Sequence, residues 1–133
     1  MPYRVELSSD GQIIRVAATA KFDFDSSLPV FADVARMLEV RPEAGILVDV
    51  REIDYTPSVS DIRQFVSRHE EMTRNLRNPH ALVTAKGVNF GMAMMMCTLI
   101  EVSGGKSHAF TDVGEAERWL LDALHQRSSS QPS

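Results

Sequence analysis

The sequence predicts an α/β domain with a mostly parallel sheet of five strands, an antiparallel N-terminal hairpin strand at one edge, and four helices. Three observations predict this class. Short apolar runs alternate with longer helical patterns along the chain. The run Gly45–Val50 is apolar and rich in β-branched residues until Asp49 interrupts it, as expected of a mid-sheet strand covered on both faces. The first two strand patterns are joined by a tight turn, which predicts a hairpin.

Length and composition restrict the location and the partners. The 133 residues suffice for one core without disulfides, and Cys97 is the only cysteine, which suits a reducing compartment. The net charge of -4 gives no electrostatic footprint for nucleic acid or for anionic lipid. The N-terminus begins with strand-like alternation and lacks the basic and then apolar layout of a signal peptide. We therefore expect a cytoplasmic protein that binds no nucleic acid and has no membrane span.

The N-terminal third predicts a hairpin followed by a helix. Residues 3–7 alternate apolar and charged side chains, Ser9-Asp10-Gly11 supplies turn chemistry, and residues 13–20 return as a second strand. Ser26 or Ser27 is predicted to cap the first helix, with Pro29 in its first turn. The helix is predicted to end at Arg41-Pro42. Its apolar face is expected to consist of Leu28, Phe31, Ala35 and Leu38.

A long second helix is predicted after the central strand. Thr56 before Pro57, or Ser58 with Asp61 three residues on, gives the spacing of a helix N-terminus, and Asn78-Pro79 is predicted to stop the helix. We interpret His69 as a packed histidine bonded to a neighbouring backbone group. The expected buried stripe is Ile62, Phe65, Val66, His69, Met72 and Leu76.

The remaining chain predicts a strand at residues 81–85, a helix at 88–102 and a last strand at 107–110. Asp112 with Glu115 is predicted to cap a final helix. Its packed residues are expected to be Val113, Ala116, Leu120 and Leu124. Residues 127–133 have the composition of a disordered tail, so residues 1–126 are expected to form a single domain.

No catalytic or metal-binding pattern is complete. His69-Glu70-Glu71-Met72 opens like a metalloprotease helix, but Thr73 stands where the second histidine is needed. Ser103–Ser107 ends like a phosphate-binding loop, but it follows a helix and lacks the first glycine. Cys97 has no basic neighbour in sequence that would lower its pKa. Isolated histidines are His80, His108 and His125. We therefore expect no enzyme, no cofactor and no metal site.

The helix predicted at residues 88–102 carries no charge before Glu101 and is apolar on both sides. Helical spacing places one group of side chains toward the sheet, namely Val88, Met92, Met95 and Leu99. Phe90, Met94 and Cys97 are predicted to point the other way. That second face needs a cover, and the run is too short to span a bilayer. Another part of the chain, a second subunit and an apolar ligand all remain open as the cover.

Several segments follow one another along the chain: Gly45–Arg51, the helix start after Tyr55, Ala81–Thr84, and Ala109–Asp112 followed by Glu115–Leu120. In this order they resemble the SpoIIAA-like family of the STAS superfamily. The resemblance implies a sheet of alternating strands and helices, and binding and regulation instead of catalysis. Some relatives of similar fold, of the Sec14 type, hold lipids in an apolar groove.

The same resemblance implies a regulatory phosphorylation site. In anti-sigma-factor antagonists of the superfamily, a serine within an Asp-Ser-Ser-Gly motif is phosphorylated at the start of the helix after the central strand. Ser58 falls on the first serine of that motif, while Val59 and Ser60 replace the second serine and the glycine. Ser58, Ser60 and Thr56 are therefore candidates for a phosphosite or a helix cap.

Two functions follow from these patterns. The first is a non-enzymatic regulatory or partner-binding module, homodimeric or bound to another protein, which uses the strand-end loop 51–60 and the apolar helix 88–102. The alternative is a small carrier or sensor of an apolar, lipid-like ligand, with the same helix as its pocket wall. The candidate interface or ligand-binding residues are Asp49, Tyr55, Phe90, Met94 and Cys97.

Overall fold

The computed structural model describes residues 2–74 and 76–130, with side chains up to residue 127. Its elements follow the predicted order and confirm the α/β class. The five strands are β1 (Tyr3–Leu7), β2 (Ile13–Ala18), β3 (Gly45–Asp49), β4 (His80–Val83) and β5 (Ser107–Phe110). The four helices are α1 (Phe24–Val40), α2 (Val59–Thr73), α3 (Val88–Val102) and α4 (Val113–Ser130). Strands β2 and β4 end two residues before their predicted ends at residues 20 and 85.

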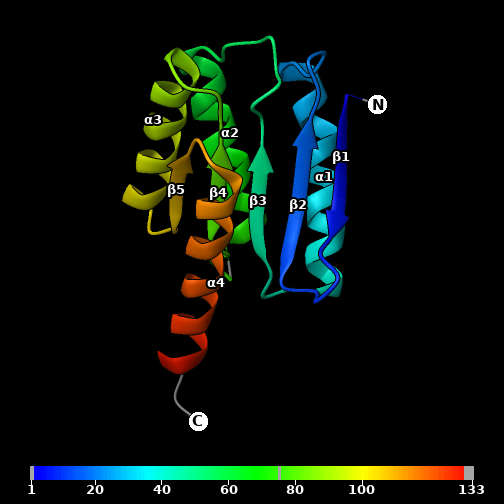
Figure 1. The fold of residues 1–133 in the computed structure, drawn as a ribbon, viewed down its shortest axis with the longest axis vertical. Helices are drawn as coiled ribbons and strands as arrows, with labels where there is room; N and C mark the ends of the chain where they lie inside the picture. The colour runs from blue at the N-terminus through cyan, green and yellow to red at the C-terminus, as the bar shows by residue number, and fades with distance from the viewer. Residues whose placement is uncertain (1, 75, 131–133) are drawn as a thin grey trace.

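The sheet has the strand order β1-β2-β3-β4-β5, so the predicted central strand β3 lies in the middle. β1 is antiparallel to β2, and the later strands are all parallel. Each parallel strand is added on the same side of its predecessor. Crossovers of one hand therefore place α1, α2 and α3 on one face of the sheet, while α4 covers β3, β4 and β5 on the other (Figure 1).

Alternation along the strands divides the core between these two faces. On β3, Ile46 and Val48 face the layer of α1, α2 and α3, whereas Leu47 packs with Leu120 of α4. On β4, Leu82 faces the three-helix layer and Ala81 faces α4. Because the helices of the three-helix layer all pack on the same sheet face, their side chains meet over the middle of the sheet.

Helix α1 begins earlier than predicted, at Phe24. The carboxylate of Asp23 accepts a hydrogen bond from the backbone N–H of Ser26 at 2.9 Å, so Asp23 is the cap and Ser26 lies in the first turn. The buried face consists of Ser27, Val30, Val34 and Leu38. The predicted face was wrong at its first and third positions, since Leu28 and Ala35 are exposed, and Phe31 is half-buried beside α2. Two apolar stripes overlap in this sequence, and periodicity alone does not choose between them.

Helix α2 begins with the predicted capping box. The Ser58 hydroxyl accepts from the Asp61 N–H at 3.0 Å, and the Asp61 carboxylate accepts from the Ser58 N–H at 3.1 Å. The helix ends at Thr73, before the predicted stop at Asn78-Pro79. Asn78 instead ties the following connection down, because its side-chain amide donates to the carbonyl oxygens of Pro42 and Ala44 at 2.8 Å each. Because the helix ends at Thr73, Leu76 lies beyond it and is not part of its buried stripe.

We expect Ser58→Ala to lower the free energy of unfolding by about 1 kcal/mol, because it leaves the Asp61 N–H without its acceptor. Ser60→Ala is the matched control, since Ser60 is exposed and makes no cap. Urea unfolding of both variants checks the prediction. Equal stability of the two variants would contradict the capping role.

Helix α3 has the predicted bounds, but its predicted sheet-facing side was wrong at Val88 and Met95, which are exposed, whereas Met92 and Leu99 are half-buried against the core. The residues buried toward the sheet are Ala93, Met96, Cys97 and Ile100. Val88, Met94, Met95 and Val102 are 38 to 78% exposed. The helix is almost uniformly apolar, so hydrophobic periodicity carries no information about its inward face. The small side chains of Ala93 and Cys97 lie on the buried face, where they let the helix approach the sheet closely.

Helix α4 begins at Val113 after Asp112 and continues to Ser130, beyond the predicted start of a disordered tail at Arg127. Residues 131–133 of that predicted tail lie outside the described residues. Within the part of the chain that the structure describes, no helix combines the length and the apolarity that crossing a membrane requires.

Candidate functional site

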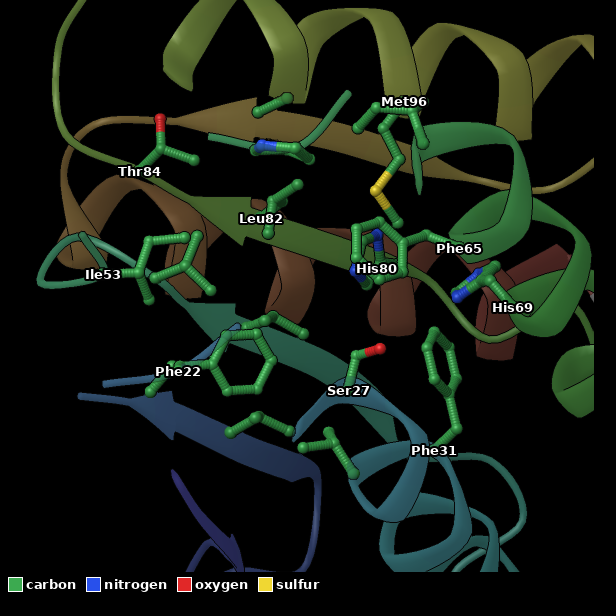
Figure 2. Close-up of a pocket in the computed structure, with 18 of the residues that line it drawn as sticks. Phe22, Ser27, Phe31, Ile53, Phe65, His69, His80, Leu82, Thr84 and Met96 are labelled. Carbon is green, nitrogen blue, oxygen red and sulfur yellow. The ribbon is translucent and has the colours of Figure 1, made fainter. Parts of the chain in front are cut away.

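A cavity of about 120 Å³ lies between the sheet and the layer of α1, α2 and α3 (Figure 2). Its floor comes from alternate residues of the central strands, which the pleat turns to this face. These are Val16 and Ala18 of β2, Ile46 and Val48 of β3, and His80 and Leu82 of β4. The position of the cavity is thus a direct consequence of strand order: it lies where the three crossover helices meet over the sheet.

The helices supply the walls. The ring of Phe65 on α2 lies between two aromatic rings of α1, with centroids 5.5 Å from Phe24 and 6.5 Å from Phe31. These pairs hold α1 against α2 at distances typical of favourable aromatic contacts. On the side of α3, Ala93 and Met96 line the cavity. The small side chain of Ala93 leaves room that a larger residue at this position would occupy.

The loop after β3 bounds the cavity at the carboxyl end of the sheet. Ile53, Tyr55 and Pro57 of this loop line it. The Tyr55 hydroxyl donates to the Asp61 carboxylate at 2.7 Å, which links the loop to the first turn of α2. Burial and this hydrogen bond raise the pKa of Tyr55. Nearby, Asn89 lines the cavity and its buried Oδ1 has no hydrogen-bond partner among the described residues.

Two buried histidines form the polar part of the lining. His69 of α2 and His80 of β4 are each 3% exposed, and their ring centroids lie 4.7 Å apart. His80 Nδ1 lies 2.8 Å from the buried hydroxyl of Ser107 on β5. The sequence predicted an isolated His80 and a His69 bonded to the backbone. His80 is not isolated, because its ring contacts that of His69. His69 is packed as predicted, but the predicted bond to the backbone was wrong, since its ring makes no hydrogen bond to the described residues.

Both imidazoles are neutral at neutral pH. Burial lowers the pKa of His69 to about 4, since a charged ring would lose its water, although Glu70 opposes the shift. Burial and the neighbouring His69 lower the pKa of His80 well below its usual value. A neutral imidazole carries one N–H donor and one acceptor nitrogen, so the pair offers hydrogen bonds without a net charge.

The candidate interface or ligand-binding residues from the sequence lie in different environments. Tyr55 lines the cavity, and Phe90 packs against the core of α2 and α3. Cys97 is buried, and burial raises the pKa of its thiol to about 11. Met94 is exposed on the outer side of α3. Asp49 is half-buried, and its carboxylate accepts from the Arg51 guanidinium at 2.8 and 3.0 Å.

Asp49 lies on the opposite face from the cavity, because Val48 and Val50 on either side of it line the cavity. Thr56, Ser58 and Ser60 are exposed at the start of α2 and do not line the cavity. Phosphorylation at Ser58 or Ser60 stays a prediction, which peptide mass mapping after incubation with cell extract and ATP would test.

The cavity could hardly be predicted from the sequence. Its lining comes from six elements, β2, β3, β4, α1, α2 and α3, and from three of the loops that connect them, and most of its residues are ordinary core residues in their own segments. The one usable signal was a histidine at the start of a buried strand, beside a second histidine on the buried stripe of the preceding helix. His80 and His69 satisfy that pattern, and they meet because side chains of α2 and β4 pack in the same layer of the core.

Comparison with known proteins identifies the fold. No protein family model matches the sequence, and no curated protein matches it. A similar solved structure is that of an uncharacterized protein of the DUF3478 family, with a SpoIIAA-like fold, from Shewanella loihica PV-4. It is 18% identical, the match covers 89% of this chain and 91% of that chain, and the TM-score is 0.54. This chain therefore has a SpoIIAA-like α/β fold.

Proposed function

We propose that this protein is a non-enzymatic binding module that holds a small apolar molecule in the cavity between the sheet and α1, α2 and α3. The observation that supports this most directly is the composition of the lining. It consists mainly of aliphatic and aromatic side chains, which come both from the sheet and from α1, α2 and α3. Apolar cavities of this kind are rare in close-packed interiors, and binding pockets are the usual exception.

The volume limits the size of the ligand. A dry, apolar cavity of about 150 Å³ is known to accept a benzene-sized molecule. At about 120 Å³, this cavity suits a molecule the size of a single ring or a short branched chain. A long acyl chain would extend beyond it, so the ligand is smaller than the membrane lipids that the Sec14 type of fold holds.

Toluene is a suitable probe. At ten times its Kd, we expect toluene to stabilise the parent protein by about 1.4 kcal/mol and so to raise Tm by a few degrees. In Ala93→Met the longer side chain occupies part of the cavity, so toluene should no longer raise Tm. Ala32→Met is the matched control, because Ala32 is exposed on α1 and outside the lining.

Thermal melts of the three proteins over a toluene series distinguish the outcomes. The proposal predicts a dose-dependent rise in Tm for the parent and for Ala32→Met, and a flat response for Ala93→Met. An identical response in all three proteins would show that toluene acts outside the cavity. No response in the parent would contradict the proposal outright. If the parent responds as predicted, mass spectrometry of the purified parent is the next measurement, to find a natural ligand that co-purifies.

A second candidate function is self-association through α3. Its outer side exposes Val88, Met94, Met95 and Val102, all within one helix. Exposed apolar patches of this kind often mark interaction sites, and methionine side chains adapt readily to a partner. A two-fold dimer would bring the same patch of both chains together.

Met94→Lys tests this second candidate. Met94 is 51% exposed, so the lysine should leave the fold and Tm nearly unchanged. In a dimer the charge would be repeated and desolvated on both chains, so we expect the variant to be a folded monomer. Sedimentation velocity of parent and variant checks this. A parent that is monomeric at high concentration would eliminate the dimer.

A further inference from the structure

We propose that His80 Nε2 forms a hydrogen bond with a hydroxyl group of the bound molecule, so that the ligand is a small neutral alcohol or phenol and not a hydrocarbon. This inference rests on the proposed function, because it assigns the chemistry of the ligand in the same cavity. It adds a specific polar contact to a site whose lining is mainly apolar.

One nitrogen of the deeply buried His80 ring has no hydrogen-bond partner among the described residues. His80 is 3% exposed and lines the cavity at its floor (Figure 2). Nδ1 is paired with the Ser107 hydroxyl at 2.8 Å, and the ring makes no further hydrogen bond to the described residues. His69 packs against the ring through its own imidazole, without a hydrogen bond between them. His80 Nε2 therefore has no hydrogen-bond partner among the described residues, and a polar group of a ligand in the cavity would supply one.

A hydroxyl group fits either tautomer of the neutral His80 ring. If Ser107 accepts from Nδ1–H, then Nε2 is an acceptor, and if Ser107 donates to Nδ1, then Nε2–H is a donor. A hydroxyl group donates or accepts by rotating about its C–O bond. A ketone, which only accepts, or an ammonium group, which only donates, fits only one of the two tautomers.

The composition of the cavity lining excludes charged ligands. None of the described residues that line the cavity is Lys, Arg, Asp or Glu. Burial also keeps both His69 and His80 neutral. A carboxylate or an ammonium group would therefore lose its hydration without meeting an opposite charge, which is far costlier than burying a hydroxyl group that finds a partner. The ligand is thus neutral, with an apolar body and one hydroxyl group.

Phenol and toluene test this inference, because they have the same number of non-hydrogen atoms and differ only in the hydroxyl group. We expect His80→Phe to weaken phenol binding by roughly tenfold relative to the parent, while toluene binding changes by less than about threefold. His108→Phe is the control, since His108 is exposed on the other side of β5, beside Trp119. The quantity compared is the ratio of the phenol Kd to the toluene Kd in each protein.

A measurement on the parent protein guards against misfolding of His80→Phe. In a ¹⁵N spectrum of the imidazoles, phenol should shift His80 Nε2 and leave His108 in place, and toluene should shift neither by a comparable amount. An unshifted Nε2 at saturating phenol overturns the inference, as does a Kd ratio that is the same in the parent and in His80→Phe. A hydroxyl group that bonds to Asn89 Oδ1 instead would give this result.

The two levels of the proposal fail differently. If toluene and phenol both fail to bind the parent, the proposed function itself is wrong. If toluene binds and the hydroxyl group has no effect on Nε2 or on the ratio, the cavity binds apolar molecules without this polar contact.

Discussion

Lowering the pH from 6.5 to about 4 is expected to reduce the free energy of unfolding by about 3 kcal/mol through His69 alone. The unfolded chain takes up a proton on this histidine near pH 6.5, whereas burial delays protonation of the folded state to about pH 4. The stabilisation is therefore fully present above pH 6.5 and is lost as the pH falls through this window. His80 acts in the same direction, because its pKa is also lowered by burial.

Urea unfolding at half-unit pH steps checks this expectation. In His69→Phe the slope between pH 6.5 and 4 should become shallower, since phenylalanine takes up no proton. The carboxylates with lowered pKa values, such as Asp61, stabilise the fold above about pH 3.8, and this stabilisation is lost only as the pH falls below that value. Parallel pH profiles for the parent and His69→Phe would contradict the buried, neutral state of His69.

We expect Leu120→Ala to lower the free energy of unfolding by about 2 to 5 kcal/mol, since it removes the centre of the contact between α4 and the sheet. Leu120 is 0% exposed and packs in the cluster of Leu47, Ala81 and Val83. Helix α4 is the cover of this sheet face over β3, β4 and β5. The side chains around Leu120 belong to strands, which relax little, so a cavity would remain.

Leu121→Ala is the matched control. This neighbouring leucine is 39% exposed, so its truncation should cost less than about 1 kcal/mol. Equilibrium unfolding of the two variants side by side checks the difference. Similar losses in both variants would mean that α4 lies on the sheet in a different rotation from that of the structure.

The order of the elements could be predicted from the sequence because local signals mark each one. Ser58 and Asp61 define the start of α2 by side-chain chemistry alone, and the structure shows both hydrogen bonds of their capping box. The apolar run at Gly45 to Val50 predicted the central strand because a strand buried on both faces has no polar alternation to display. The α/β class and the bounds of α3 followed from the same kind of local pattern.

The inward faces of the helices could not be predicted in the same way. In α3 apolar residues lie on all sides of the helix axis, so their spacing does not show which side faces the sheet. Met96 and Cys97 face inward because the small side chains on that side let the helix approach the sheet closely. The cavity depends on contacts between distant segments. His69 and His80 meet because side chains of α2 and β4 pack in the same layer of the core, and the residues around each histidine in the sequence do not predict this contact.

The central claim, that the cavity binds a small neutral molecule, is tested most directly by methyl NMR of the methionines during a phenol titration. Met96 and Met72 line the cavity, while Met94 and Met95 are exposed on the outer side of α3. If phenol binds in the cavity, the methyl signals of Met96 and Met72 should show saturable shifts and intermolecular Overhauser effects, and those of Met94 and Met95 should stay unchanged. Effects confined to Met94 and Met95, or none at Met96 at any phenol concentration, would contradict it.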